Sequence, residues 1–175
     1  KKVATDAKCF MQASFASDKI LADLVGQYLP QEKGALADLF CGRGTFSLPL
    51  SKRFNVDGFE SDSGAIEALK DASNGAVTLY KRDLFKNPLS KTELLPYRFV
   101  VINPPRAGAL EQIKTLARSK CEKIIYISCN PESFARDATI LEKGGYKLQE
   151  ATPIDQFYWS SHLEVVGVFN YLDLP

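Results

Sequence analysis

Short apolar runs that alternate with helical patterns are the feature that most constrains the fold of this chain. Five runs, at 35–40, 56–60, 77–81, 99–103 and 124–128, have the length and composition of buried strands. The segments between them carry apolar residues at helical spacing, over 46–53, 63–72, 109–119 and 131–143. Such alternation is typical of parallel strands joined by crossover helices. It therefore predicts an open α/β sheet.

Both ends of the chain depart from this alternation. Residues 14–28 have apolar positions at helical spacing, with Ser17 as a cap and Pro30 beyond the end, so they predict a helix before the first strand. Residues 146–154 and 164–171 are two strand-like runs with no helix between them, which predicts an antiparallel hairpin. No internal repeat or proline-rich linker divides the sequence. We expect one domain over residues 1–175.

Composition agrees with a single globular core, since 45% of the 175 residues are hydrophobic and 25% are charged. No apolar run approaches the roughly 18 residues of a membrane-spanning helix, and the start lacks the apolar stretch of a signal peptide. We therefore expect a cytoplasmic protein. The chain opens on Lys1, and its only methionine is Met11 within an ordered-looking segment, which indicates a fragment of a longer protein.

Charge and cysteine content narrow the function classes. The net charge is only +1, so no strong electrostatic surface for a polyanion is visible. The four cysteines are too few and too scattered for a disulfide framework, and no CxxC pair offers a zinc or iron-sulfur site. We expect reduced thiols and no metal.

A glycine turn follows the first apolar run. Ligands of open α/β sheets bind outside the carboxyl ends of the strands, and Gly42 and Gly44 allow the backbone to approach a ligand there. Glu60 ends the second run, where a carboxylate can accept both hydroxyls of a ribose. A dinucleotide site would need a third glycine where Ser47 stands, which disfavours a dehydrogenase. Because GxG alone is a weak signal, a turn without a ligand remains the alternative.

The fourth run ends in Asn103-Pro104-Pro105-Arg106. Two consecutive prolines stiffen the chain and withhold two backbone donors, so the Asn103 side chain is held in a defined geometry beside the expected cleft. The alternative is a rigid strand exit with no role in binding.

Cys129 lies where the fifth run stops and the next helix begins. A thiol near a helix N-terminus is a candidate nucleophile, because the helix dipole favours the thiolate. We assign Cys9 and Cys121 to packing and Cys41 to the glycine turn. A buried, unreactive thiol is the alternative for Cys129, since free cysteines are among the most buried residues.

Two further ionisable side chains lie at the start of the last run. His162 is the only histidine, so a Cys-His pair like that of cysteine proteases stays open, beside a structural or hydrogen-bonding role. Glu164 opens the run, and taken alone it could be a solvated charge.

The motifs together resemble the catalytic domain of the RNA uracil-C5 methyltransferases that use S-adenosylmethionine. They are FMQAS at 10–14, DLFCGRGTFSL from Asp38, GFE ending at Glu60, NPPRAG from Asn103, YISCNP around Cys129 and DQFYWSSHLE at 155–164. The resemblance implies a Rossmann-like class I methyltransferase fold, with a mostly parallel seven-stranded sheet and a C-terminal antiparallel hairpin. It implies an RNA substrate, with transfer and ribosomal RNA both open, and a missing N-terminal RNA-binding domain.

The resemblance also assigns roles. The cofactor would lie against Gln12, Phe40, Glu60 and Asp83, with Asn103 between it and the target base and Phe10 near that base. Apart from the resemblance, Gly42, Gly44 and Thr45 of the glycine turn are candidates for cofactor contact, and Arg106, Arg136 and His162 are candidates for RNA contact. Cys129 would be the nucleophile that adds to uracil C6, and Glu164 the base that removes the C5 proton. Thr45 departs from the family, which has Asn at that position.

Two other functions stay open. An N-methyltransferase would carry an aromatic residue after Asn-Pro-Pro, where this chain has Arg106. A non-catalytic RNA- or cofactor-binding module is the third possibility, against which the presence of both Cys129 and Glu164 argues.

Overall fold

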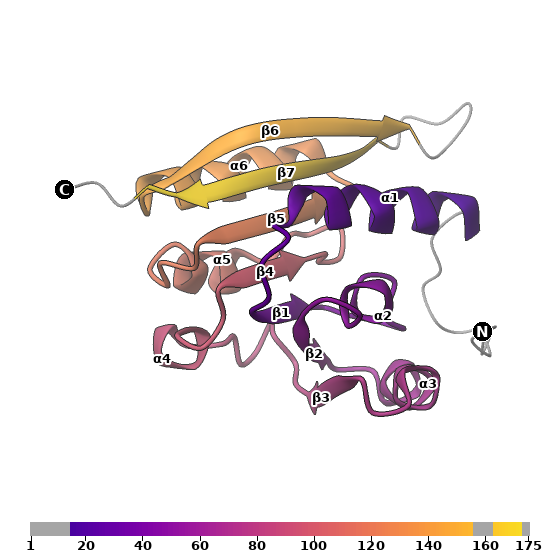
Figure 1. Cartoon of the computed structure of the whole chain (residues 1–175). Coiled ribbons are helices and arrows are strands. Elements are labelled where there is room, and N and C mark those ends of the chain that lie inside the picture. Colours follow the sequence, from indigo (N-terminus) through magenta and orange to yellow (C-terminus); the bar gives the residue numbers. More distant parts are fainter. Residues whose placement is uncertain (1–14, 156–162, 173–175) are drawn as a thin grey trace.

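The computed structural model describes residues 15–155 and 163–172, and it confirms the open α/β sheet. The strands are β1 (Ala35–Leu39), β2 (Asn55–Glu60), β3 (Val77–Lys81), β4 (Phe99–Ile102), β5 (Lys123–Ser128), β6 (Tyr146–Asp155) and β7 (Leu163–Tyr171). The helices are α1 (Phe15–Tyr28), α2 (Ser47–Leu50), α3 (Ser63–Ser73), α4 (Lys91–Leu94), α5 (Leu110–Leu116) and α6 (Pro131–Lys143). The seven strands form one sheet in the order β3-β2-β1-β4-β5-β7-β6 (Figure 1).

Strand direction follows the sequence prediction. The first five strands pair in parallel, whereas β7 runs antiparallel to both β5 and β6. The hairpin prediction is confirmed, but its second strand, and not its first, docks on β5. The residues of β7 from Glu164 to Phe169 are all buried, as a central strand requires. The outer strand β6 carries Pro153, which an edge position tolerates.

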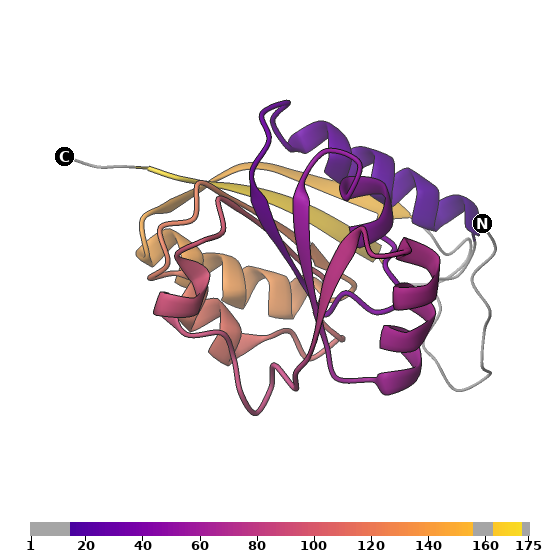
Figure 2. The same cartoon turned by 60° about the horizontal axis from the view of Figure 1, so that its bottom comes forward.

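Helices cover both faces of the sheet and create two cores (Figure 2). Strand β4 shows how the residues divide, because successive side chains of a strand point to opposite faces. Val100 and Ile102 pack in the core that includes α5 and α6, whereas Phe99 and Val101 pack in the core with α1 and α2. A strand that is buried on both faces must be apolar throughout, which explains the continuous run Phe99–Ile102.

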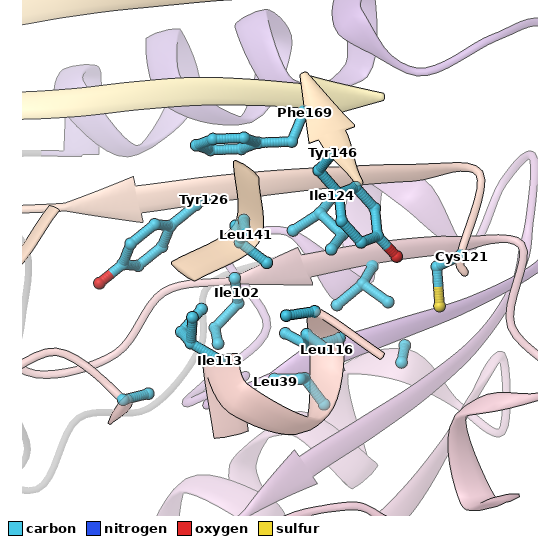
Figure 3. Packing of buried hydrophobic residues seen from close by; sticks show 14 of the residues in the cluster. Leu39, Ile102, Ile113, Leu116, Cys121, Ile124, Tyr126, Leu141, Tyr146 and Phe169 are labelled. Atoms are coloured by element: carbon cyan, nitrogen blue, oxygen red, sulfur yellow. The ribbon is translucent and has the colours of Figure 1, made fainter. Parts of the chain in front are cut away.

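The core on the α5 and α6 side is drawn in Figure 3. Leu141 from α6, Ile113 from α5 and Phe169 from β7 are fully buried there, together with the Tyr126 side chain. Cys121 is buried in the same cluster, which agrees with a packing role. Cys41, Cys121 and Cys129 are all free thiols, and no group of residues in the described ranges could hold a metal ion.

Two helices are shorter than the sequence predicted, and a third was not predicted. The expected helix over 46–53 is only α2, and the one over 109–119 ends at Leu116 before a tighter turn in which Ser119 N–H donates to the Leu116 carbonyl. The short helix α4 was missed. Its signal is a capping box, in which the Ser90 hydroxyl and the Glu93 carboxylate bond each other's backbone N–H groups. Among the residues described, none of the helices has the length and apolarity to cross a bilayer.

Candidate active site

The candidate residues that the structure describes gather at one edge of the sheet. Strands β1, β2, β4 and β5 present their carboxyl ends there, and antiparallel β7 begins there because Ser128 pairs with Val165. The turn after β1 and the loop after β4 also meet, since Asn103 N–H donates to the Leu39 carbonyl over 3.2 Å. This is the edge at which ligands of open α/β sheets bind.

The turn after β1 is built from residues with left-handed backbone. Phe40, Gly42 and Gly44 have φ values of 60°, 52° and 89°. A Cβ on Gly44 would lie 2.3 Å from Cδ1 of Leu69, so a side chain at this position would require packing to shift. A Cβ on Gly42 would meet no described atom within 4 Å, so the turn presents bare backbone to open space. This geometry fits the cradle expected for a cofactor.

Glu60 ties the end of β2 to that turn. Its Oε2 accepts a hydrogen bond from Gly42 N–H at 3.0 Å, while Oε1 accepts from the N–H groups of Ser61 at 2.6 Å and Asp62 at 2.9 Å. A carboxylate oxygen has two acceptor positions, so Oε2 has one left for a ligand hydroxyl. The half-buried carboxylate is therefore fixed in place at the lip of the cradle.

Asp38 lies beneath the turn and was not singled out from the sequence. Its side chain is fully buried, and Oδ2 accepts a hydrogen bond from the Ser47 hydroxyl. The other oxygen, Oδ1, has no hydrogen-bond partner among the residues described. Burial raises the pKa of Asp38 to about 7, against the opposing effect of the Ser47 hydrogen bonds. Its position just before the glycine turn was the signal that could have identified it.

Phe40 and Asp83 extend the cradle toward β3. The Phe40 ring packs against Phe85 with centroids 5.2 Å apart, and Phe85 is itself half exposed. The Asp83 carboxylate accepts from Phe85 N–H and forms a 3.2 Å ion pair with Lys86. The hydrogen bond and charge of Lys86 lower the pKa of Asp83, which keeps it ionised. Arg82 N–H donates to the Glu60 carbonyl, which joins the end of β2 to the segment after β3. Glu60 and Asp83 therefore lie at the ends of neighbouring strands.

Cys129 and Glu164 come together across strands β5 and β7. Cys129 lies between the end of β5 and Asn130, the N-cap of α6, while Glu164 is the second residue of β7, next to the Val165 that pairs with Ser128. Glu164 is 6% exposed, and its Oε2 has no hydrogen-bond partner in the described ranges. Positions 35 residues apart in sequence are thus close enough for the charge of Glu164 to act on the Cys129 thiol.

The electrostatics of the thiol differ from the sequence expectation. Burial, together with the nearby Glu164 charge, raises the pKa of Cys129, although Arg106 acts in the opposite direction. The direction of this pKa shift is opposite to the one expected from the helix dipole alone. Burial also raises the pKa of Glu164, and the charge of Asp18 on α1 adds to this shift. A carboxylate with a raised pKa is a stronger proton acceptor.

Arg106 and Arg136 occupy different positions relative to the thiol. Arg106 is exposed in the loop after β4, and its charge acts on Cys129. Arg136 pairs with buried Asp137 at 2.8 Å and donates to the Ala107 carbonyl at 3.2 Å. RNA contact by either arginine stays a prediction. The roles expected of Phe10, Gln12 and His162 fall outside the described residues, and Thr45 is half-buried in the glycine turn.

Comparisons with known proteins place the chain in one family. Residues 65–171 match the family model of tRNA (uracil-5-)-methyltransferases. An uncharacterized RNA methyltransferase of Brucella suis is 47% identical over 93% of this chain and 40% of its own length. A 23S rRNA (uracil(1939)-C(5))-methyltransferase of Mannheimia succiniciproducens is 35% identical over 94% of this chain and 39% of its own.

A solved structure confirms the predicted class I methyltransferase fold. The tRNA (uracil-54, C5)-methyltransferase of Pyrococcus abyssi, in complex with S-adenosyl-L-homocysteine, superposes with a TM-score of 0.78 at 32% identity, over 93% of this chain and 40% of that one. The S-adenosyl-L-homocysteine bound in that relative agrees with the predicted S-adenosylmethionine dependence. The chain spans about 40% of the length of these relatives. On this basis the chain belongs to the tRNA (uracil-5-)-methyltransferase family.

Proposed function

We propose that this domain transfers a methyl group from S-adenosylmethionine to C5 of a uridine in RNA, through a transient bond between Cys129 and uracil C6. The observation that carries the proposal is the thiol of Cys129 beside the buried carboxyl of Glu164, at the edge that also holds the glycine turn. One relative is named as a 23S rRNA methyltransferase and another as a tRNA methyltransferase, so we name RNA, and neither kind alone, as the substrate class.

The glycine turn after β1 and the Glu60 carboxylate support the proposal that a cofactor binds there. The left-handed turn exposes backbone at Gly42, and the fixed Glu60 carboxylate offers one free acceptor position at the lip of the cradle. Asp38 adds a buried carboxyl oxygen without a described partner. When bound, S-adenosylmethionine supplies an electrophilic methyl group. The residues of the chain bind and orient it.

The reaction needs a nucleophile because uracil C5 is otherwise unreactive. Addition of the Cys129 thiolate to C6 moves the electrons of the C5–C6 double bond into an enolate, which makes C5 nucleophilic. Once C5 carries the methyl group, Glu164 accepts the C5 proton. The electrons of that C–H bond restore the double bond, the S–C6 bond breaks, and Cys129 leaves as a thiolate. Arg106 favours the thiolate at both ends of this sequence.

The target base has to reach this thiol. Cys129 is half-buried at the sheet edge, so a base that stays stacked within a helix cannot reach it. Enzymes that act on a base take it out of its stack, or act on unpaired nucleotides. We therefore expect an unpaired or everted uridine to be the substrate.

RNA containing 5-fluorouridine tests the proposal directly. Fluorine at C5 cannot be removed as a proton, so elimination is blocked and the thiol remains bonded to C6 after methylation. We expect a protein-RNA complex that survives denaturing electrophoresis, in the presence of the methyl donor. The same RNA with uridine is the control and should leave no stable complex.

The outcome separates the three functions. An N-methyltransferase would transfer methyl groups to its substrate without forming this complex, and a binding module would do neither. Methyl incorporation into uridine RNA with no trapped complex on 5-fluorouridine RNA would contradict the covalent mechanism.

Substitution of Glu60 tests the cradle separately. Glu60→Ala removes the proposed ribose acceptor and the hydrogen bond to Gly42 N–H, and an unpaired buried group costs roughly 1–3 kcal/mol. The dissociation constant for S-adenosylmethionine, measured by calorimetry, should rise about tenfold. Glu60→Gln keeps one acceptor oxygen and should lose less affinity. Unchanged affinity in Glu60→Ala would remove Glu60 from the cofactor site.

A further inference from the structure

Helix α6 holds the loop 103–109 through one face. Asn130, Ser133 and Asp137 are spaced so that they lie on the same side of the helix. Asn130 Nδ2 and the Ser133 hydroxyl both donate to the Arg106 carbonyl, at 3.2 Å and 3.3 Å. Arg136 donates to the Ala107 carbonyl at 3.2 Å. The loop that carries Asn103 and Arg106 is thus fastened to the helix that begins beside the nucleophile.

Asp137 is the centre of this attachment. Its side chain is fully buried, and Oδ2 accepts from the Tyr126 hydroxyl at 2.8 Å and from Ala109 N–H at 3.4 Å. Its Oδ1 accepts from Arg136 Nε at 2.8 Å. One carboxylate therefore connects strand β5, helix α6 and the loop. Figure 3 shows the Tyr126 hydroxyl pointing away from Ile124 and Leu141, out of the apolar cluster.

The loop backbone is shaped to close on this carboxylate. Gly108 has a φ of 74°, and a Cβ there would lie 2.6 Å from Arg136 Nη2 and 2.8 Å from Asp137 Oδ2. A side chain at this position would separate the loop from the ion pair, so glycine permits the close approach. A buried carboxylate is costly unless it is paired and hydrogen-bonded, which makes this arrangement strongly dependent on every partner.

We propose that Asp137 is a positioning residue that holds Arg106 beside the nucleophile Cys129. The guanidinium of Arg136, a candidate for RNA contact, takes part in this attachment. Charged groups act on the thiol from each side: Glu164 from β7 opposes the thiolate, and Arg106 from the loop favours it. Asp18 of α1 acts on Glu164 in turn. The hydrogen bonds of Asp137 therefore keep Arg106, the charge that favours the thiolate, in its place near Cys129.

The rate of alkylation of Cys129 by iodoacetamide, read from its peptide by mass spectrometry, tests the proposal. Only the thiolate reacts, so losing Arg106 from its place should slow the reaction about threefold at neutral pH and move its pH midpoint upward. We expect this in Asp137→Asn. A direct charge effect would have the opposite sign, because removing a negative charge and freeing Arg136 both favour the thiolate. The sign therefore distinguishes positioning from simple electrostatics.

A second variant and matched controls complete the experiment. Tyr126→Phe removes one hydrogen bond to Asp137 without changing any charge, and it should slow alkylation in the same direction. It also carries the test if Asp137→Asn does not fold. The controls are Tyr97→Phe and Asp57→Asn, because Tyr97 donates to Asp57 over 2.7 Å in a similar tyrosine-aspartate pair that joins the segment before β4 to β2. Both controls should alkylate at the parent rate.

A double-mutant cycle with Arg106→Gln tests whether the hydrogen bonds of Asp137 act on the thiol through Arg106. If they do, adding Tyr126→Phe to Arg106→Gln should cause no further slowing. Additive effects, faster alkylation in both Asp137→Asn and Tyr126→Phe, or equal slowing in the controls would overturn the proposal. The importance of Asp137 for catalysis rests on the proposed function, but the alkylation of Cys129 needs neither RNA nor cofactor. A failure of the trapping experiment can therefore be told from a failure of this inference.

Discussion

Cys129→Ala should abolish both methyl transfer to uridine and formation of the complex with 5-fluorouridine RNA. Among the other thiols in the described ranges, Cys41 lies in the glycine turn and Cys121 precedes β5, and burial raises the pKa of both, so neither offers an accessible thiolate in place of Cys129. Without addition to C6, C5 does not become nucleophilic, so we expect a loss of at least about 10³-fold in the rate of methyl transfer. Radiolabelled methyl incorporation into RNA measures it, with S-adenosylmethionine affinity as a check that the cradle is intact.

Cys121→Ala is the matched control for this loss. Cys121 precedes the amino end of β5, whereas Cys129 follows its carboxyl end, and the same thiol is removed from each. The control should lower stability by about 1 kcal/mol through a small cavity and leave methyl transfer near the parent rate. Uridine methylation by Cys129→Ala would show that the covalent mechanism is wrong.

Glu164→Gln should separate the two halves of the reaction. Addition to C6 and methyl transfer do not need the base, but release of the enzyme does, so methylated RNA should accumulate bonded to Cys129. The expected result is a denaturation-resistant complex on ordinary uridine RNA, which carries the labelled methyl group and forms without 5-fluorouridine. Turnover should fall at least about 10²-fold.

Glu164→Gln should also lower the pKa of the Cys129 thiol. Glu164 raises the pKa of Cys129, so removing its charge should lower that pKa and speed alkylation at neutral pH. The control is Glu142→Gln, an exposed glutamate near the C-terminal end of α6, which should change neither property. Turnover of Glu164→Gln at the parent rate would exclude Glu164 as the base.

The fold was largely readable from the order of its elements. The apolar run Phe99–Ile102 predicted a strand buried on both faces, and the helical spacing over 131–143 predicted α6 with its observed bounds. The hairpin was also predicted, but the strand that joins β5 was not. That choice depends on burial: β7 is apolar along most of its length, while β6 carries charged and polar residues and a proline that suit an edge.

The candidate site was readable only as separate pieces. Motifs identified Cys129, Glu164, Glu60 and Asn103, because each stands where an apolar run ends or begins and strand ends gather at one edge. Whether two of them face each other depends on the strand register, in which Ser128 pairs with Val165. Asp38 was missed because its burial and its unpaired oxygen are properties of the packed structure.

Sequence by itself determined the types and order of the candidate site groups, since the motifs name a thiol, a carboxylate and a glycine turn at the ends of predicted strands. Only the tertiary structure decided their electrostatics and neighbours. The pKa of Cys129 is raised because burial and Glu164 outweigh Arg106, and Arg136 turns toward Asp137 and the loop. These outcomes depend on distances between segments remote in the chain. Local patterns do not encode such distances, because they arise from how helices and strands pack together.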